Sequence, residues 1–387
     1  MALRITRTAA AAVRRGHPWV YREGIVRPPK ALASGAAVEL LDEEGGFLGR
    51  GLWDAASPIA VRVVDHARGP ALDAAALGAR VARAIERRDG RFDADTTAYR
   101  LCNGEGDRVP GLVIDRYGDV AVVRLDTDAW DPHLAGVVRA IAKPLAARGV
   151  RSIGKRVAGD GKKLEVIEGP APPDRVLVRE HGMAMEVDLS HGQKTGAFLD
   201  QRENRARVRA LARGRPRVCN LFSYAGGFSI AAALGGAARV TSVDVAAAAH
   251  ATAQRTFRAN GVDPGAHAFV SADVFAFLDQ ARARGDRFDL IISDPPSFAP
   301  SERARPRAIQ AYRRLHAAVA AVLEDGGVLC ASSCSSHVNA EDFAATLDDM
   351  ALGRSDLRLC DIFGQPDDHP SLPAWPEGRY LKFVVLA

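Results

Sequence analysis

The chain has 387 residues, of which 47% are hydrophobic, and it carries a formal net charge of +5 with an isoelectric point near 9.1. This length and composition suffice for two or three domains with at least one sizeable core, and they exclude a disordered or fibrous protein. The basic balance fits a polyanionic partner without requiring one. No segment approaches the ~18 uninterrupted apolar residues of a membrane span, and the N-terminus lacks a secretory apolar run, so we expect a cytoplasmic protein.

The cysteines are odd in number and widely scattered along the chain: Cys102, Cys219, Cys330, Cys334 and Cys360. They lack the paired spacing of metal ligands, and their number and scatter do not suggest a disulfide framework. We therefore expect reduced thiols and no bound metal.

The first 30 residues form the most basic segment, with seven Lys and Arg residues against one acidic residue. Aromatic and imidazole side chains are interleaved with these cations, a mixture suited to phosphate contacts and to stacking on bases or sugars. We predict RNA-binding roles for Arg15, His17, Trp19 and Tyr21. An ordinary basic surface is the alternative.

The first half of the chain predicts two small domains. From Ala36 onward, short alternating strands are broken by Gly-Gly and Ser-Pro, which is typical of a small β-barrel. Helical spacing follows over Ala74 to Arg88, then a hairpin over 109–125 and a second helix over His133 to Arg148. The predicted domains are a β-barrel at 1–70, an α+β unit at 71–175 and a third domain at 176–387.

The third domain begins with a strand pair over 175–189, and from Arg217 strand-like runs alternate with helical segments. This alternation indicates an α/β fold with a parallel, doubly wound sheet. The predicted strands are 217–222, 239–244, 268–273, 289–294 and 326–333, and the predicted helices begin at Gly227 and cover 246–260, 274–284 and 308–323.

In such a sheet, ligands bind at the carboxyl ends of the strands. Gly226 and Gly227 after the first strand allow a tight turn into a helix and a close approach to a ligand. Asp244 ends the second strand 18 residues after Gly226, where an acidic side chain accepts hydrogen bonds from ribose hydroxyls. Asp273 ends the third strand and is placed to meet an adenine edge, and Asp294 ends the fourth.

The Gly-x-Gly-x-x-Gly sequence of nicotinamide dehydrogenases is missing from the first loop. The loop Ser-Tyr-Ala-Gly-Gly-Phe, followed by Asp, Asp and Asp-Pro-Pro, resembles class I S-adenosylmethionine methyltransferases. This resemblance implies S-adenosylmethionine as cofactor and an Asp-Pro-Pro segment turned toward the amino group of a base. The cofactor-binding residues expected here are Asn220, Phe222, Ser223, Tyr224, Gly226, Gly227, Asp244, Asp273, Asp294 and Pro295.

Cys334 follows the fifth strand and is flanked by serines, whereas a lone cysteine in a strand is usually a small buried hydrophobe. C5 of cytosine is too weak a nucleophile to attack a methyl sulfonium directly. Addition of a thiolate at C6 makes C5 an enamine carbon, which can attack. We predict Cys334 as the nucleophile, and Asp294 as the acid that stabilises the adduct through N3 and N4.

Over nearly its whole length the chain resembles the bacterial 23S ribosomal RNA cytosine-5 methyltransferases of the large-subunit methyltransferase I type. Residues 15–21 are similar to the opening of that family's RNA-binding PUA domain, and residues 103–112 resemble its middle domain. The stretch 192–202 is the most distinctive, and in the family it lies beside the cofactor. The resemblance thus implies 5-methylcytosine in 23S ribosomal RNA as product, and further cofactor-binding residues at Lys194, Thr195, Phe198, Gln201 and Arg202.

The resemblance leaves several questions open. Ser297 stands where a different subfamily has a second cysteine beside its Asp-Pro segment, so the base that removes the C5 proton is unidentified. A sister group methylates N7 of guanine without a thiol, and Cys334 argues against it. From another class, an RNA-binding scaffold with a vestigial methyltransferase domain is disfavoured by the intact acids and thiol. The oligomeric state is not determined, and a homodimer stays open.

Overall fold

The computed structural model describes residues 1–157 and 164–387. The chain divides into two compact units, and each combines segments that are distant in sequence. The first unit consists of residues 1–179, 187–199 and 367–378. The second unit consists of residues 180–186, 200–366 and 379–387.

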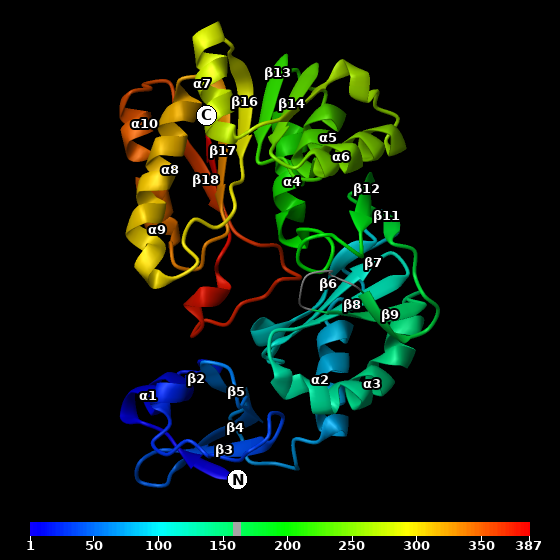
Figure 1. Cartoon of the computed structure of the whole chain (residues 1–387), viewed down its shortest axis with the longest axis vertical. Coiled ribbons are helices and arrows are strands. Elements are labelled where there is room, and N and C mark those ends of the chain that lie inside the picture. The colour runs from blue at the N-terminus through cyan, green and yellow to red at the C-terminus, as the bar shows by residue number, and fades with distance from the viewer. Residues whose placement is uncertain (158–163) are drawn as a thin grey trace. The chain divides into compact units, whose positions relative to one another are not determined.

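The first unit begins with a mixed five-stranded sheet in the order β1-β3-β4-β5-β2 (Figure 1). Its core is apolar and includes Ile5, Val13, Leu40 and Val61. The strands predicted from Ala36 onward are present, but the helix within the basic N-terminal segment was not predicted. The elements are β1 (Ala2–Arg4), α1 (Arg7–Arg14), β2 (Trp19–Tyr21), β3 (Ala37–Leu41), β4 (Phe47–Trp53) and β5 (Ile59–Asp65).

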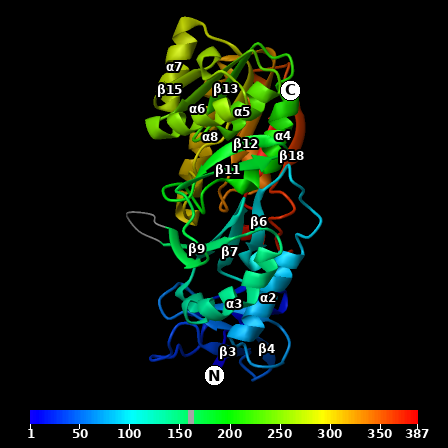
Figure 2. The same ribbon diagram turned by 90° about the vertical axis from the view of Figure 1, so that its right-hand side faces the viewer.

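A second five-stranded sheet follows in the order β10-β9-β8-β7-β6, and two helices pack against each other beside it (Figure 2). The two predicted helices are confirmed within two residues at each end, and the predicted hairpin is confirmed with a first strand that begins three residues later than predicted. The elements are α2 (Ala74–Glu86), β6 (Ala98–Asn103), β7 (Leu112–Tyr117), β8 (Val120–Leu125), α3 (Leu134–Ala146), β9 (Ser152–Arg156) and β10 (Leu164–Glu168). The predicted strand pair after it forms a two-stranded sheet of β11 (Arg175–Glu180) and β12 (Met183–Asp188).

The second unit is built on a seven-stranded sheet in the order β15-β14-β13-β16-β17-β19-β18. The first five strands in this order are parallel, so the doubly wound fold is confirmed, and the strand order reverses beside β13. The strands are β13 (Arg217–Leu221), β14 (Arg239–Asp244), β15 (Ala268–Ser271), β16 (Phe288–Ser293), β17 (Leu323–Ser333), β18 (Leu359–Phe363) and β19 (Lys382–Leu386).

Helices cover both faces of this sheet (Figure 1). On one face, apolar side chains of α7 to α10 pack with residues such as Leu221 and Ile291, and on the other face α4 and α5 pack with Val218 and Ile292. The helices are α4 (Arg202–Leu211), α5 (Gly227–Leu234), α6 (Ala247–Ala259), α7 (Val274–Arg284), α8 (Arg305–Ala320), α9 (Ala340–Ala345) and α10 (Asp348–Leu352).

The C-terminal part of the sheet was not predicted. β19 pairs antiparallel with both β17 and β18, so the sheet is parallel only as far as β17. Antiparallel strands need no helical crossover, and the alternation of strands and helices therefore gave no signal for them. None of the helices in the described ranges is long and apolar enough to cross a membrane.

Candidate cofactor and catalytic site

The loop after β13 has an unusual backbone. Phe222 and Tyr224 have φ values of 58° and 45°, which residues other than glycine rarely adopt, and Gly226 has a φ of 77°. A Cβ atom at Gly226 would lie 2.6 Å from the Cβ of Ala253. Non-glycine residues in this left-handed conformation, such as Phe222 and Tyr224, cost of order 1 to 3 kcal/mol each and cluster at ligand sites. The loop therefore has the backbone of a binding loop at the N-terminus of α5.

Asp244 at the end of β14 connects this loop to the next one. Its Oδ2 accepts a hydrogen bond from the backbone N–H of Tyr224 at 2.8 Å, and its Oδ1 accepts one from Ala246 at 2.9 Å. Each carboxylate oxygen can accept a further hydrogen bond. Asp244 thus orients the loop and still has lone pairs for a ligand hydroxyl.

Three buried oxygen atoms near the ends of β13 and β16 have no hydrogen-bond partner among the described residues: Asn220 Oδ1, Ser223 Oγ and Ser293 Oγ. The amide nitrogen of Asn220 is fixed, because its Nδ2 donates to Ser229 Oγ at 2.8 Å. Buried polar groups are nearly always hydrogen-bonded in native proteins. These atoms therefore point to a polar ligand at this edge of the sheet.

Gln201 links two neighbouring strands of the sheet. Its Nε2 donates to Asp294 Oδ1 at 3.1 Å and to Ser332 Oγ at 3.0 Å, and its Oε1 accepts from Asn204 at 2.7 Å. Gln201 and Asn204 are buried. The amide therefore holds the carboxylate after β16 in register with the end of β17, where Ser293 pairs with Ala331.

Cys334 directly follows β17 and is partly exposed, whereas Cys102, Cys219 and Cys330 are buried. Burial raises the pKa of these three thiols well above the ordinary value, so they are inert core residues. Cys360 is exposed on β18. Among the described cysteines, only Cys334 lies at the strand ends that carry Asp294.

Two further side chains lie around Cys334. Tyr312 of α8 donates to Ser333 Oγ at 2.9 Å, and burial raises its pKa to about 12. Lys382 of β19 is buried and donates to the backbone oxygen of Ser335. Neither residue was predicted from the sequence. For Lys382, the sequence signal was a lysine at the start of the apolar run Lys-Phe-Val-Val-Leu. A lysine is rarely buried in a strand, so its presence there indicates a special role.

Other predicted cofactor residues have protein partners. Asp273 is exposed and caps α7 by accepting from the backbone N–H of Ala276 at 3.0 Å. Arg202 is buried at the start of α4 and donates to Glu203 at 3.1 Å. The ring of Phe222 packs against the core beneath α7 and α8, and Pro295 is buried after β16. Their contacts with a cofactor stay predictions.

Lys194, Thr195 and Phe198 belong to the first unit. The Lys194 ammonium lies 4.6 Å from the centroid of the Phe198 ring. Thr195 is fully buried, donates to Asp115 and shares a 2.8 Å hydrogen bond with the Tyr117 hydroxyl. Thr195 therefore has a structural role in this unit, and the predicted cofactor contacts of all three residues stay predictions.

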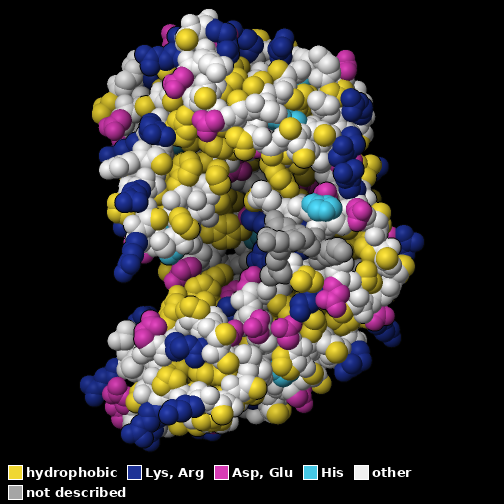
Figure 3. All heavy atoms as spheres, viewed as in Figure 1, with side chains coloured by type: hydrophobic (Ala, Val, Ile, Leu, Met, Phe, Trp, Pro, Cys, Tyr) yellow, Lys and Arg dark blue, Asp and Glu magenta, His cyan; other side chains and the backbone are white. Residues whose placement is uncertain are grey.

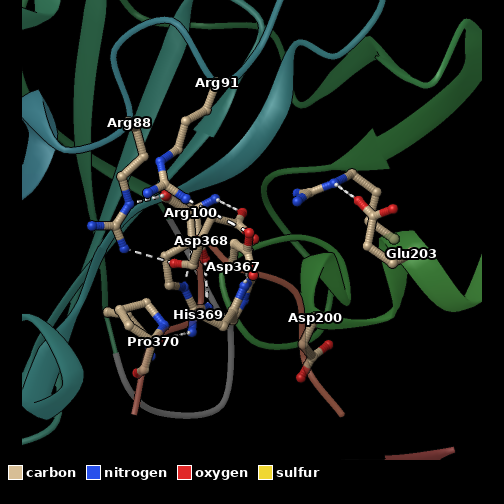
Figure 4. A network of polar contacts seen from close by, with 12 residues as sticks. Arg88, Arg91, Arg100, Asp200, Glu203, Asp367, Asp368, His369 and Pro370 are labelled. Atoms are coloured by element: carbon tan, nitrogen blue, oxygen red, sulfur yellow. Dashed lines mark hydrogen bonds and ion pairs between the residues drawn. The ribbon is translucent and has the colours of Figure 1, made fainter. Parts of the chain in front are cut away.

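The same polar network continues within the first unit. Arg100 forms a two-pronged ion pair with Asp115, and its backbone N–H donates to Asp368 Oδ2 at 2.8 Å. Arg88 donates to the backbone oxygen of Asp368 at 2.7 Å. Figure 4 shows Arg88, Arg100 and Asp368 converging. The network ties residues 367–378 to the second sheet of the unit.

The predicted RNA-binding residues also lie in the first unit. Arg15 is exposed, and 39% of Tyr21 is exposed. The indole N–H of Trp19 donates to Glu105 at 2.8 Å, and its ring lies edge-on to Trp375. His17 lies 3.5 Å from Glu377, which raises the pKa of the imidazole. Arg15 and Tyr21 are accessible to a partner, while Trp19 and His17 already have protein contacts.

A doubly wound sheet with a strained glycine loop after its first strand, an acid at its second and Asp-Pro-Pro at its fourth defines a class I methyltransferase. The chain matches the S-adenosylmethionine-dependent methyltransferase family over residues 156–377 and the PUA-like domain over residues 3–66. The chain belongs to this methyltransferase family, and its cofactor is S-adenosylmethionine.

Relatives extend over almost the entire chain. A protein of Deinococcus radiodurans named ribosomal RNA large subunit methyltransferase is 40% identical, covering 99% of this chain and 96% of its own length. Ribosomal RNA large subunit methyltransferase I of Klebsiella pneumoniae is 34% identical, covering 95% and 93%. The solved structure of a putative methyltransferase complexed with SAH has a TM-score of 0.88 at 26% identity, covering 100% and 99%.

The residues at the sheet edge fit this cofactor. S-adenosylmethionine has an ammonium group, ribose hydroxyls and an adenine amino group, all of which are hydrogen-bond donors. The unpartnered oxygens of Asn220, Ser223 and Ser293 are acceptors, as is the carboxylate of Asp244. A donor-rich ligand would satisfy these buried atoms. Among the described residues, no group of three or more His, Cys, Asp and Glu side chains could hold a metal ion.

Proposed function

We propose that this protein transfers a methyl group from S-adenosylmethionine to C5 of a cytosine in 23S ribosomal RNA. Two findings support the RNA substrate: the relatives named ribosomal RNA large subunit methyltransferases and the PUA-like match at residues 3–66. The position of Cys334 supports the choice of atom and base.

The observation that carries the proposal is the pairing of β16 with β17. Because Ser293 is aligned with Ala331 in this parallel pair, Asp294 and Cys334 emerge from neighbouring strands at the same edge. Gln201 bridges Asp294 and Ser332 across the two strands. An acid and a partly exposed thiol thus belong to the same edge of the sheet, and a guanine N7 enzyme would need no thiol.

The chemistry follows from these two groups. The Cys334 thiolate adds to C6 of cytosine, forming a C–S bond and moving electron density to C5. Asp294 hydrogen-bonds N3 and N4 and so stabilises the adduct. S-adenosylmethionine, when bound, supplies the electrophilic methyl group. A base then removes the C5 proton, and the electron pair of that C–H bond re-forms the ring double bond as Cys334 leaves.

The test compares alanine variants of two cysteines that are close in sequence, Cys334 and Cys330. Cys334→Ala should abolish methyl transfer while keeping the affinity for S-adenosylmethionine, measured by calorimetry. Cys330→Ala should keep the activity and lower the thermal stability, because Cys330 only fills the core. RNA with 5-fluorocytosine at the target should trap the wild-type enzyme covalently, since fluorine replaces the proton that must leave.

Two other outcomes separate the alternatives. Full activity of Cys334→Ala, or methylated guanine in digested product RNA, would support guanine N7 methylation. Absence of S-adenosylmethionine binding in the wild-type protein would support an RNA-binding scaffold. Covalent trapping that disappears in Cys334→Ala is expected only for the cytosine mechanism.

A further inference from the structure

Lys382 is a charged residue in the interior of the second unit. It begins β19 and is 2% exposed. Its Nζ donates to the backbone oxygens of Ser335 and Tyr380. Burial of an ammonium without a counterion is expensive, and two carbonyl partners compensate for its lost hydration only in part. The position of this charge therefore needs an explanation beyond packing.

The backbone of Lys382 is held beside the candidate nucleophile. Lys382 pairs with Ser333, the residue before Cys334, in the antiparallel β17–β19 ladder. Its Nζ reaches past Cys334 to the carbonyl of Ser335. Burial lowers the pKa of Lys382 to about 8, and the negative charge of the Cys334 thiolate raises it. A buried ammonium thus interacts electrostatically with a partly exposed thiol.

We propose that Lys382 is a positioning residue that holds Cys334 as a thiolate through its fixed positive charge. The inference rests on the proposed function, because it assigns Lys382 to the step in which Cys334 adds to C6. The thiolate, and not the thiol, is the nucleophile, and a neighbouring cation favours it. Lys382 is buried and both its hydrogen bonds go to carbonyls, so it acts through Cys334 and does not itself touch the RNA base.

Three other described groups around Cys334 and Tyr312 do not supply this charge. Asp294 is an acid, and as an anion it opposes thiolate formation. Tyr312 has a pKa raised to about 12 by burial, so its phenol is neutral. His316, stacked beside Tyr312, has a pKa lowered to about 4 by burial and is also neutral. Among the groups named here, Lys382 is the one with a positive charge to offset Asp294.

The experiment measures the thiol itself. In a Cys360→Ser background, which removes the exposed cysteine of β18, the rate of Cys334 alkylation by iodoacetamide is followed against pH, and mass spectrometry verifies the modified peptide. The midpoint should lie below the ordinary cysteine value of about 8.5. Lys382→Gln, which keeps N–H donors but removes the charge, should raise the midpoint by about one pH unit or more.

Lys382→Arg is the matched control, because it retains the positive charge and should keep the low midpoint. Methyl transfer by Lys382→Gln should lose kcat at neutral pH with little change in KM, and should recover as the pH rises. A merely structural role of Lys382 would lower activity at every pH and leave the alkylation midpoint unchanged.

An unchanged midpoint in Lys382→Gln would overturn the inference. If this variant does not fold, as judged by thermal unfolding and S-adenosylmethionine binding, the wild-type midpoint decides: a value at or above about 8.5 overturns the inference. Failure of the proposed function gives a different result, since Cys334→Ala would then methylate RNA whatever the alkylation midpoints are.

Discussion

At the scale of single residues, Asp244 and Asp273 show that similar positions in sequence can have different environments. Both were predicted from strand ends. Asp244 accepts hydrogen bonds from two backbone N–H groups in separate loops, whereas Asp273 accepts one hydrogen bond, from a backbone N–H of the helix that it caps. A cap satisfies the start of a helix whether or not a ligand is bound. Asp244 is thus the better candidate for the ribose contact.

We predict that Asp244→Ala weakens S-adenosylmethionine binding by about 1.5 to 3 kcal/mol, the value of a charge-assisted hydrogen bond, without unfolding the protein. Calorimetry and thermal unfolding measure the two effects. Asp263→Ala is the control, because Asp263 also accepts a backbone N–H, from Gly265, but lies in the turn before β15. A wild-type dissociation constant for Asp244→Ala would show that the ribose lies elsewhere.

At the scale of elements, α8 combines the site with a basic surface. Tyr312 on its buried side reaches Ser333, while Arg307, Arg313 and Arg314 lie on its exposed side. Figure 3 shows Lys and Arg side chains along the surface over this helix. Arg307 and Arg313 form no ion pair with another described residue, and Arg305 is paired with Asp342. The helix starts at the carboxyl edge, close in sequence to Asp294.

Arg303 is exposed in the turn that precedes α8. We predict that the triple variant Arg303→Gln, Arg307→Gln and Arg313→Gln weakens binding of target RNA and flattens its salt dependence. Each lost phosphate contact should reduce the slope of log K against log salt by about 0.7 for single-stranded RNA. S-adenosylmethionine affinity should stay at the wild-type value, because these side chains are exposed.

The matched control neutralises Arg213, Arg258 and Arg282, which are exposed near the amino edge of the same sheet. This variant has the same change in net charge. Equal effects of the two triple variants would mean that net charge alone attracts the RNA and that α8 is an ordinary solvated surface.

At the scale of the whole molecule, residues 1–66 cannot be removed from the first unit without disturbing the rest of it. Leu52 and Val64 pack in the apolar core of the sheet β10-β9-β8-β7-β6, together with residues of α2 and α3. Arg62 and Trp19 both contact Glu105. Deletion of residues 1–66 would therefore open the core as well as remove the basic segment. Surface substitutions are the sharper test of RNA binding by this unit.

We predict that Arg15→Gln, Arg27→Gln and Lys30→Gln together reduce RNA affinity and its salt slope while thermal stability is kept, because all three side chains are exposed. The control variant neutralises Arg83, Arg139 and Lys143, which are exposed on α2 and α3. RNA affinity measured at several salt concentrations compares the two. An unchanged slope in the N-terminal variant would place the phosphate contacts outside the basic segment.

The sequence by itself determined the elements whose signals are local. Helix α7 was predicted with its observed bounds, because Asp273 caps its start and Gly285, with a φ of 74°, ends it. Helix α8 begins three residues earlier than predicted, since Pro306 is accepted in the first turn of a helix. The strand-end acids were found because parallel strands deliver their carboxyl ends to one edge of the sheet.

Only the tertiary structure decided which distant residues meet. Gln201 contacts Asp294 and Ser332, and Lys382 reaches the residue after Cys334, across separations that no periodicity encodes. The antiparallel pairing of β19 with β17 brings the last strand of the chain beside the thiol. Thr195 likewise donates a hydrogen bond to Asp115, which is 80 residues away in the sequence. Long-range packing satisfies buried polar groups with partners that local sequence cannot specify.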